Sequence, residues 1–228
     1  MKVTLVVPVY DGTRYLAQAI SSALAQSRAP DEILVVDDGS TDAPEAILRS
    51  FGSAVRHLRQ ERRGTPAARN RGIDASDGDL ITFLDHDDLL TPDSIELRVN
   101  ALLREPELGC VHGTVEQFIS PELTPAEREV LPARLPTVNG RVPGATMFRR
   151  EMFDRVGRFD ETVTIGYMID WVSRAQAASV AIGSIPDVVL RRRVHATNSV
   201  HDVQALEAHY LRALRTAVRR RRVAASTQ

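Results

Sequence analysis

Short apolar runs alternate with amphipathic segments through the first half of the 228-residue chain. Buried strands are predicted where the apolar residues are continuous, at residues 3–9, 33–36 and 80–84, and a further strand is expected at residues 55–58. Helices are predicted where apolar side chains recur every three or four positions or turn residues mark a start, at residues 15–26, 44–50, 64–73 and 95–103. This alternation is typical of an α/β fold, so we expect an open, mostly parallel twisted sheet with helices on both faces.

The second half of the chain has a less regular pattern. Strands are predicted at residues 109–113, 145–148 and 188–190, and helices at residues 151–156, 169–178 and 203–214. Residues 120–141 contain four prolines and are expected to form a long surface loop. The sequence contains no internal repeat.

Two predicted strands end in acidic residues. Asp37 and Asp38 close the second strand, and Asp85, Asp87 and Asp88 follow the strand at 80–84. Because ligands of parallel sheets bind beyond the carboxyl ends of the strands, we expect these carboxylates to share one site. Strand alternation would place Asp85 and Asp87 on the same side, where Mg²⁺ or Mn²⁺ would offset their repulsion. The alternative is an acidic loop that merely leads into the next helix.

Composition narrows the class of protein. Hydrophobic residues make up 43% of the chain and charged residues 26%, with a formal net charge of −1. This net charge is too small to attract nucleic acid or an anionic membrane. No apolar run is long enough for a membrane span. Cys110 is the one cysteine, so no internal disulfide can form. We therefore expect a soluble cytoplasmic protein without a signal peptide, with the inner membrane face as an alternative location through the basic residues 219–222.

Several short motifs occur together in one order along the chain. They are Pro8-Val9-Tyr10, Val35-Val36-Asp37-Asp38-Gly39-Ser40-Thr41-Asp42, Ala68-Arg69-Asn70, Leu84-Asp85-His86-Asp87-Asp88, Gly157-Arg158-Phe159-Asp160-Glu161, Asp170-Trp171 with Arg174, and Arg193-Val194-His195 with Asn198. In this set the chain resembles the family 2 glycosyltransferases of the GT-A fold, over roughly residues 3–200. The resemblance implies a nucleotide-sugar-binding half at 1–108 and an acceptor and catalytic half at 109–200, followed by a C-terminal helix and basic tail at 201–228.

The resemblance also implies an activity and the residues that bind the donor. A family member transfers a sugar from a nucleoside diphosphate sugar, usually a UDP-sugar, to a hydroxyl acceptor with inversion at the anomeric carbon. Carried over by motif, Pro8 and Tyr10 flank the nucleobase and Asp38 accepts a hydrogen bond from it. Arg69 lies near the nucleotide, and Asp85 reaches towards the ribose and the metal.

The metal ligands follow from the same comparison of motifs. Asp87 would be the main protein ligand of Mn²⁺ or Mg²⁺, with Asp85 beside it, and the cation would neutralise charge on the leaving diphosphate. His195 would be a further metal or phosphate contact. A surface histidine next to an arginine cluster is an equally good interpretation of His195.

One position departs from the family pattern. Counting back from Arg174, the family's Glu-Asp pair falls on Tyr167 and Met168, and a thioether cannot deprotonate a hydroxyl. Asp170 is a candidate replacement for the base, although two residues on a helix point about 200° apart. A structural carboxylate is the favoured alternative for Asp170. Glu161, the acceptor itself or a partner chain could also supply the base.

Three hypotheses about function therefore remain open. The first is a metal-dependent inverting glycosyltransferase, and the second is a non-catalytic relative that binds a nucleotide or a partner. The third is a nucleotidyltransferase, which would need a glycine-rich basic loop after the first strand that residues 9–14 resemble only faintly. A homodimer through the apolar stripe of the C-terminal helix is a further expectation.

Overall fold

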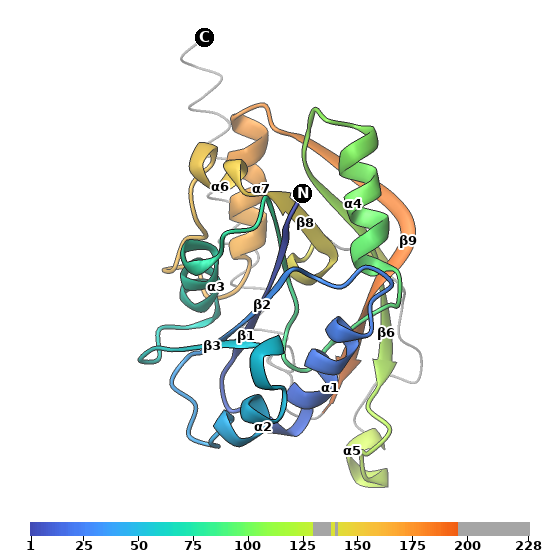
Figure 1. Cartoon of the computed structure of the whole chain (residues 1–228). Coiled ribbons are helices and arrows are strands. Elements are labelled where there is room, and N and C mark those ends of the chain that lie inside the picture. The colour runs from blue at the N-terminus through green and yellow to red at the C-terminus, as the bar shows by residue number, and fades with distance from the viewer. Residues whose placement is uncertain (130–137, 140, 196–228) are drawn as a thin grey trace.

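A computed structural model describes residues 1–129, 138–139 and 141–195 of the chain. The predicted α/β class is confirmed, because a single nine-stranded sheet is flanked by helices (Figure 1). The strands are β1 (Val3–Val9), β2 (Glu32–Asp37), β3 (Arg56–Arg59), β4 (Leu80–Phe83), β5 (Leu89–Leu90), β6 (Leu108–Ile119), β7 (Val138–Asn139), β8 (Thr146–Arg149) and β9 (Ala181–Val194). The helices are α1 (Thr13–Leu24), α2 (Glu45–Ser50), α3 (Thr65–Ala75), α4 (Ser94–Arg104), α5 (Pro125–Glu129), α6 (Glu151–Arg155) and α7 (Tyr167–Ala177), with short 3₁₀ turns at Gly52–Ala54 and Pro143–Ala145.

The first four strands of the chain form the predicted parallel sheet. Their spatial order is β3-β2-β1-β4, and every neighbouring pair in it is parallel. All seven residues of β1 are buried, as expected for a central strand covered on both faces. The strand continues through Pro8, which lies opposite Val36, and ends at Val9.

Beyond β4 the sheet is mixed rather than mostly parallel. β8 is antiparallel to both β4 and β6, β9 is parallel to β6, and β5 is antiparallel to β9. The strands predicted at 109–113 and 188–190 are much longer in the structure. Pro186 lies inside β9, where the register shifts between His112 and Thr114 of the neighbouring strand and so accommodates the proline.

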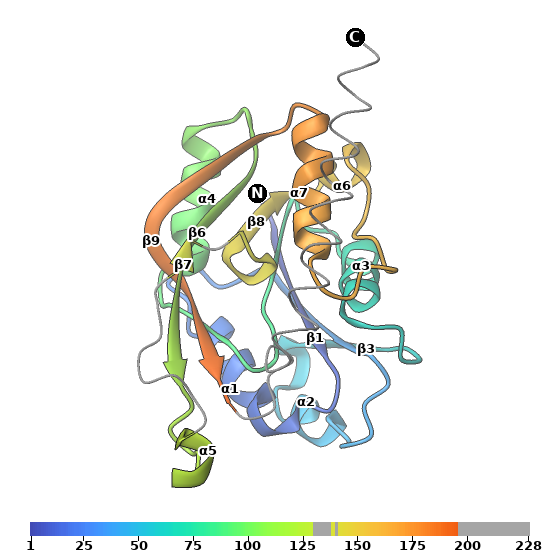
Figure 2. The ribbon, with the colours of Figure 1, turned by 180° about the vertical axis from the view of Figure 1, so that it is seen from behind.

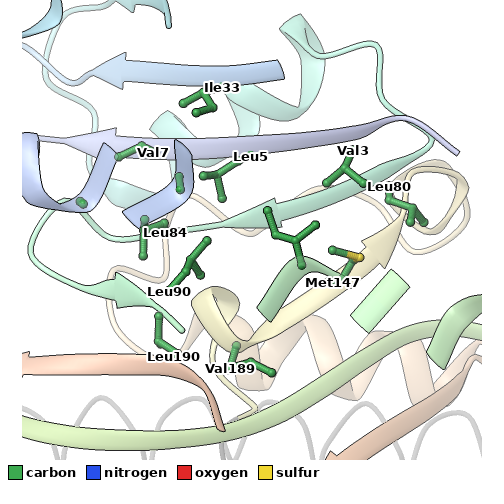
Figure 3. Close-up of a cluster of buried hydrophobic side chains, with 14 of the residues drawn as sticks. Val3, Leu5, Val7, Ile33, Leu80, Leu84, Leu90, Met147, Val189 and Leu190 are labelled. Carbon is green, nitrogen blue, oxygen red and sulfur yellow. The ribbon is translucent and has the colours of Figure 1, made fainter. Parts of the chain in front are cut away.

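Helices cover both faces of the sheet (Figure 2). On one face α1 and α4 pack against residues that alternate along β1, β2 and β4. Figure 3 shows part of this cluster, which includes Leu5, Val7, Leu84, Leu90 and Leu190. On the other face α3, α6 and α7 cover a second cluster that contains Phe83 and Phe148. The two cores hold the ends of the strands in place.

The remaining expectations concern the periphery. The segment predicted as a loop at 120–141 contains the short helix α5 and the short strand β7 within its described residues. None of the helices in the described ranges is long and apolar enough to cross a membrane. The C-terminal helix, the tail at 201–228, Asn198 and the predicted dimer contact lie outside the described residues.

Candidate functional site

Three loops meet where the neighbouring parallel strands β2, β1 and β4 end. The loop after β1 carries Tyr10, the loop after β2 carries Asp38, and the loop after β4 carries residues 85–88. We call this the acidic edge of the sheet. As expected from the topology, it brings together predicted site residues that are far apart in the sequence.

Asp38 fastens a neighbouring loop. Its buried carboxylate accepts hydrogen bonds from the Gln60 side chain (2.7 Å) and from the backbone N–H groups of Arg63 (2.9 Å) and Gly64 (2.7 Å). A carboxylate has about four acceptor positions, so three of them serve residues 60–64. Asp38 therefore fixes the loop that precedes α3.

Tyr10 lies beside that loop. The guanidinium carbon of Arg62 is 3.8 Å from the centre of the Tyr10 ring, which is van der Waals contact for a stacked cation. Arg62 itself is exposed and Tyr10 is half-buried. Pro8, the other residue predicted at the nucleobase, is buried within β1. One face of Tyr10 is therefore covered by a side chain of the protein.

Arg69 is a buried cation with unused donors. It is 1% exposed, and one Nη donates to Asp85, which holds the two predicted residues together. Its Nε and other Nη have no acceptor among the described residues. The rings of Phe83 (5.6 Å) and Tyr167 (5.2 Å) lie near the guanidinium. Because leaving buried charged donors unsatisfied is costly, this environment favours an anionic ligand.

Helix α3 is held in position by the turn at its middle. A Cβ atom on Gly72 would lie 2.3 Å from a Val6 methyl group, so only glycine allows α3 to approach β1 this closely. The Asn70 amide donates to the Phe159 carbonyl (2.9 Å) and accepts from the Phe159 N–H (3.0 Å). These contacts set the position from which Arg69 reaches Asp85.

The acidic run after β4 is a turn and not an extension of the strand. β4 ends at Phe83, and the Asp88 N–H donates to the Asp85 carbonyl (3.0 Å). The predicted strand alternation of Asp85, His86 and Asp87 is therefore wrong. Burial raises the pKa of the Asp88 carboxyl well above its ordinary value, and the charges of Asp87 and Asp85 act in the same direction.

Asp87 is paired with His195, the two residues predicted as metal ligands. His195 Nε2 lies 3.1 Å from Asp87 Oδ2, and both side chains are mostly buried. Burial alone would raise the pKa of Asp87, but the His195 hydrogen bond and the nearby histidine charges outweigh it and lower the pKa. The His195 ring also lies 4.9 Å from the Tyr15 ring. The interpretation of His195 as a surface side chain is wrong, because it is only 6% exposed.

The predicted metal ligands are divided between two partners. Asp85 faces Arg69, whereas Asp87 faces His195. Within residues 1–129, 138–139 and 141–195, no three acidic, histidine or cysteine side chains form a ready metal cluster. Any cation at this edge would therefore need further ligands from elsewhere, such as a bound diphosphate.

Arg193 is the functional residue that sequence reasoning missed. Its guanidinium is 2% exposed and donates to the Asp87 carbonyl (2.8 Å), Gln18 Oε1 (2.6 Å) and Ser120 Oγ (3.2 Å). Its backbone N–H donates to the Asp88 carboxylate (2.9 Å). Arg193 thus ties β9 to the acidic turn. An arginine cluster next to His195 is ordinarily exposed, so the sequence contains no signal for the burial of this side chain.

Asp170 lies in a buried ion pair. Arg174 Nε is 2.9 Å from Asp170 Oδ2, and the Asp170 side chain is 3% exposed. Arg174 also donates to the carbonyls of Val156 (2.6 Å) and Arg158 (2.7 Å), so the pair supports the segment before α7. Met168, at the position of the family's base, is buried in the apolar cluster on that face.

Glu161 is a second carboxylate near α3. It accepts hydrogen bonds from Asn70 (3.0 Å) and from the Arg63 guanidinium (2.7 Å), and about a third of its side chain is exposed. Since Asn70 follows Arg69, Glu161 belongs to the surroundings of the acidic edge.

Comparison with curated proteins gives relatives of one kind. An uncharacterized glycosyltransferase of Rickettsia typhi is 29% identical over 231 residues, covering 93% of this chain and 72% of the relative. An uncharacterized glycosyltransferase of Rickettsia bellii is 30% identical over 217 residues, covering 89% of this chain. The match covers only 31% of that longer relative, so the chain spans about a third of it.

Solved structures share the fold at low sequence identity. S. aureus TarS 1-349 in complex with UDP-GlcNAc has a TM-score of 0.68 and 17% identity, covering 92% of this chain and 64% of that one. The complex of the same protein with UDP has a TM-score of 0.67. The fold is thus of the GT-A type.

The family model described as Glycosyl transferase family 2 matches residues 4–157. This range includes all three loops of the acidic edge and Arg69 of α3. This match covers more than half of the chain and decides against a nucleotidyltransferase. The chain belongs to glycosyl transferase family 2 and is a glycosyltransferase.

Proposed function

We propose that this enzyme transfers a sugar from a nucleoside diphosphate sugar, with UDP as the nucleotide, to a hydroxyl acceptor with inversion. The observation that carries the proposal is Arg69, a buried guanidinium with two unused donors beside Asp85 at the acidic edge. A nucleotide bound there would supply the missing acceptors. The TarS complexes with UDP and UDP-GlcNAc support the choice of UDP.

We further propose Mn²⁺ or Mg²⁺ as the cofactor, held by Asp87, Asp85 and His195. The donor set fits, because carboxylate oxygens suit both ions and the imidazole nitrogen favours Mn²⁺. The lowered pKa of Asp87 keeps this carboxylate ionised and able to act as a ligand. When bound, the cation would supply positive charge to the leaving diphosphate.

Other residues would bind the nucleotide, position the nucleobase and accept the proton of the acceptor. Arg69 binds and orients the nucleotide, while Tyr10 and the loop fastened by Asp38 position the nucleobase. Inversion requires the acceptor oxygen to attack the anomeric carbon from the side opposite the diphosphate, as one proton leaves the hydroxyl. Asp170 can accept that proton only by giving up its pairing with Arg174, whereas Glu161 is partly exposed. Both carboxylates remain candidates for the base.

The test is the thermal midpoint with UDP, GDP, CDP and dTDP, each with and without Mn²⁺. A ligand present at 100 times its Kd stabilises the folded state by about 2.7 kcal/mol. For a chain of this size the midpoint should rise by roughly 5–10 °C. We expect UDP to produce this rise and Mn²⁺ to be required for most of it.

Asp87→Ala should abolish the Mn²⁺-dependent part of the shift, and because it also removes the partner of His195 the shift is measured from the variant's own unliganded midpoint. The matched control is Asp77→Ala, which removes an exposed carboxylate that precedes β4 at its opposite end. Full UDP affinity in Asp87→Ala would overturn the metal assignment. A lack of response to every nucleotide would overturn the donor, and binding without any turnover would support the non-catalytic hypothesis.

A further inference from the structure

Three consecutive arginines in β9 project to two different sides. The guanidinium groups of Arg191 and Arg193 both lie over the Phe118 ring, at 4.8 Å and 4.9 Å. Arg191 is exposed and also pairs with Glu116 (3.1 Å) across the two strands. Because side chains alternate along a strand, Arg192 projects from the opposite side.

That opposite side faces the end of β4. Leu190 precedes Arg192 by two residues and therefore shares its side. A Cβ atom on Gly144 would lie 3.1 Å from a Leu190 methyl group and 3.8 Å from the carbonyl oxygen of Phe83, the last residue of β4. Arg192 lies roughly 7 Å further along β9, in the direction of the acidic turn.

The contacts of Arg193 show how close Arg192 lies to the acidic turn. The Arg193 N–H bonds to the Asp88 carboxylate and its guanidinium to the Asp87 carbonyl, so this part of β9 runs directly beside the turn. Arg192 is therefore close to the candidate metal ligand Asp87.

Arg192 differs from both neighbouring arginines in its contacts. It is half-buried and makes no hydrogen bond or ion pair to any residue of the described ranges. Its five N–H groups can form the planar fork that matches two phosphate oxygens. A guanidinium placed beside the acidic turn on the β4 side is suited to an anion that also approaches Asp87.

We propose that Arg192 is a further donor-binding residue that contacts the phosphate oxygens of the nucleoside diphosphate. This inference rests on the proposed function, since it requires a diphosphate at the acidic edge. It gives the arginines of β9 separate roles. Arg193 positions the acidic turn, Arg192 binds the ligand, and Arg191 stabilises the outer side of the strand pair.

The experiment compares Arg192→Gln with Arg191→Gln, a matched control from the same strand. Calorimetric titration with UDP and with uridine is carried out in Mn²⁺ for both variants and the wild type. Arg192→Gln should weaken UDP binding about tenfold or more and leave uridine binding unchanged, because only the phosphate contact is lost. Arg191→Gln should match the wild type for both ligands, and the unliganded thermal midpoints show whether both variants fold.

Other results would contradict either the role of Arg192 or the proposed function. Wild-type UDP affinity in Arg192→Gln, or an equal loss in Arg191→Gln, would overturn the role of Arg192 while the proposed function stands. An equal loss of uridine affinity would show that the substitution disturbs the whole site and would also overturn it. A wild type that does not bind UDP would refute the proposed function itself.

Discussion

Replacing Arg193 with alanine should destabilise the protein and disturb its site together. The side chain is buried, donates hydrogen bonds to Asp87, Ser120 and Gln18, and lies over the Tyr15 ring at 4.5 Å. A hydrogen bond to a charged group contributes about 1.5–3 kcal/mol, but these bonds share one group and are not additive. We expect a loss of about 4 kcal/mol in the free energy of unfolding, which corresponds to a fall of roughly 8–16 °C in the midpoint.

Urea unfolding measures the stability, and UDP titration in Mn²⁺ measures the effect on the acidic turn. The control is Arg191→Ala, which removes an exposed ion pair with Glu116 that is worth at most about 1 kcal/mol. Arg193→Ala should lose UDP affinity even under conditions where it is fully folded, because the Asp87 carbonyl loses its guanidinium donor and the turn is then held only by the backbone N–H of residue 193 and by His195. A loss of stability below about 1 kcal/mol, or unchanged UDP affinity, would refute the argument.

Two further substitutions test the surroundings of the donor. Arg62→Ala should strengthen UDP binding about two- to fivefold, because it frees the Tyr10 face at a cost of about 0.5–1 kcal/mol in lost stacking, and calorimetry would measure the change. Unchanged or weaker binding would indicate that the nucleobase does not compete with Arg62. Met168→Asp should keep or raise turnover per folded molecule while lowering stability, because Met168 is buried in an apolar cluster. Turnover is measured by the release of UDP. A clear loss of turnover in the folded variant would show that Met168 belongs to a differently built site.

The parallel half of the fold could be predicted because its strands are buried on both faces. The apolar runs of β1, β2 and β4 are continuous and differ clearly from the helices between them. In contrast, β6 and β9 contain many polar residues, and only short pieces of them, residues 109–113 and 188–190, were predicted as strands. Their length depends on pairing with each other, which a local pattern does not contain.

The site shows a similar division. Carboxylates at strand ends marked the acidic edge, and the topology then brought Asp38, Asp85 and Asp87 to it. The burial of Arg193 could not be predicted, because an arginine run usually lies on the surface and its partners come from α1 and the turn after β4. Likewise, the pairing of Asp170 with Arg174 follows their i, i+4 spacing, but its burial depends on tertiary packing.

Helix α3 has consequences for how the enzyme can move. A single turn of this helix is joined to three different parts of the protein, through Arg69 to Asp85, Asn70 to Phe159 and Gly72 to Val6. A rotation or a slide of the helix would break all three contacts at once. We therefore expect α3 to act as a fixed reference during the catalytic cycle, so that substrates enter and leave through displacements of the loops around it.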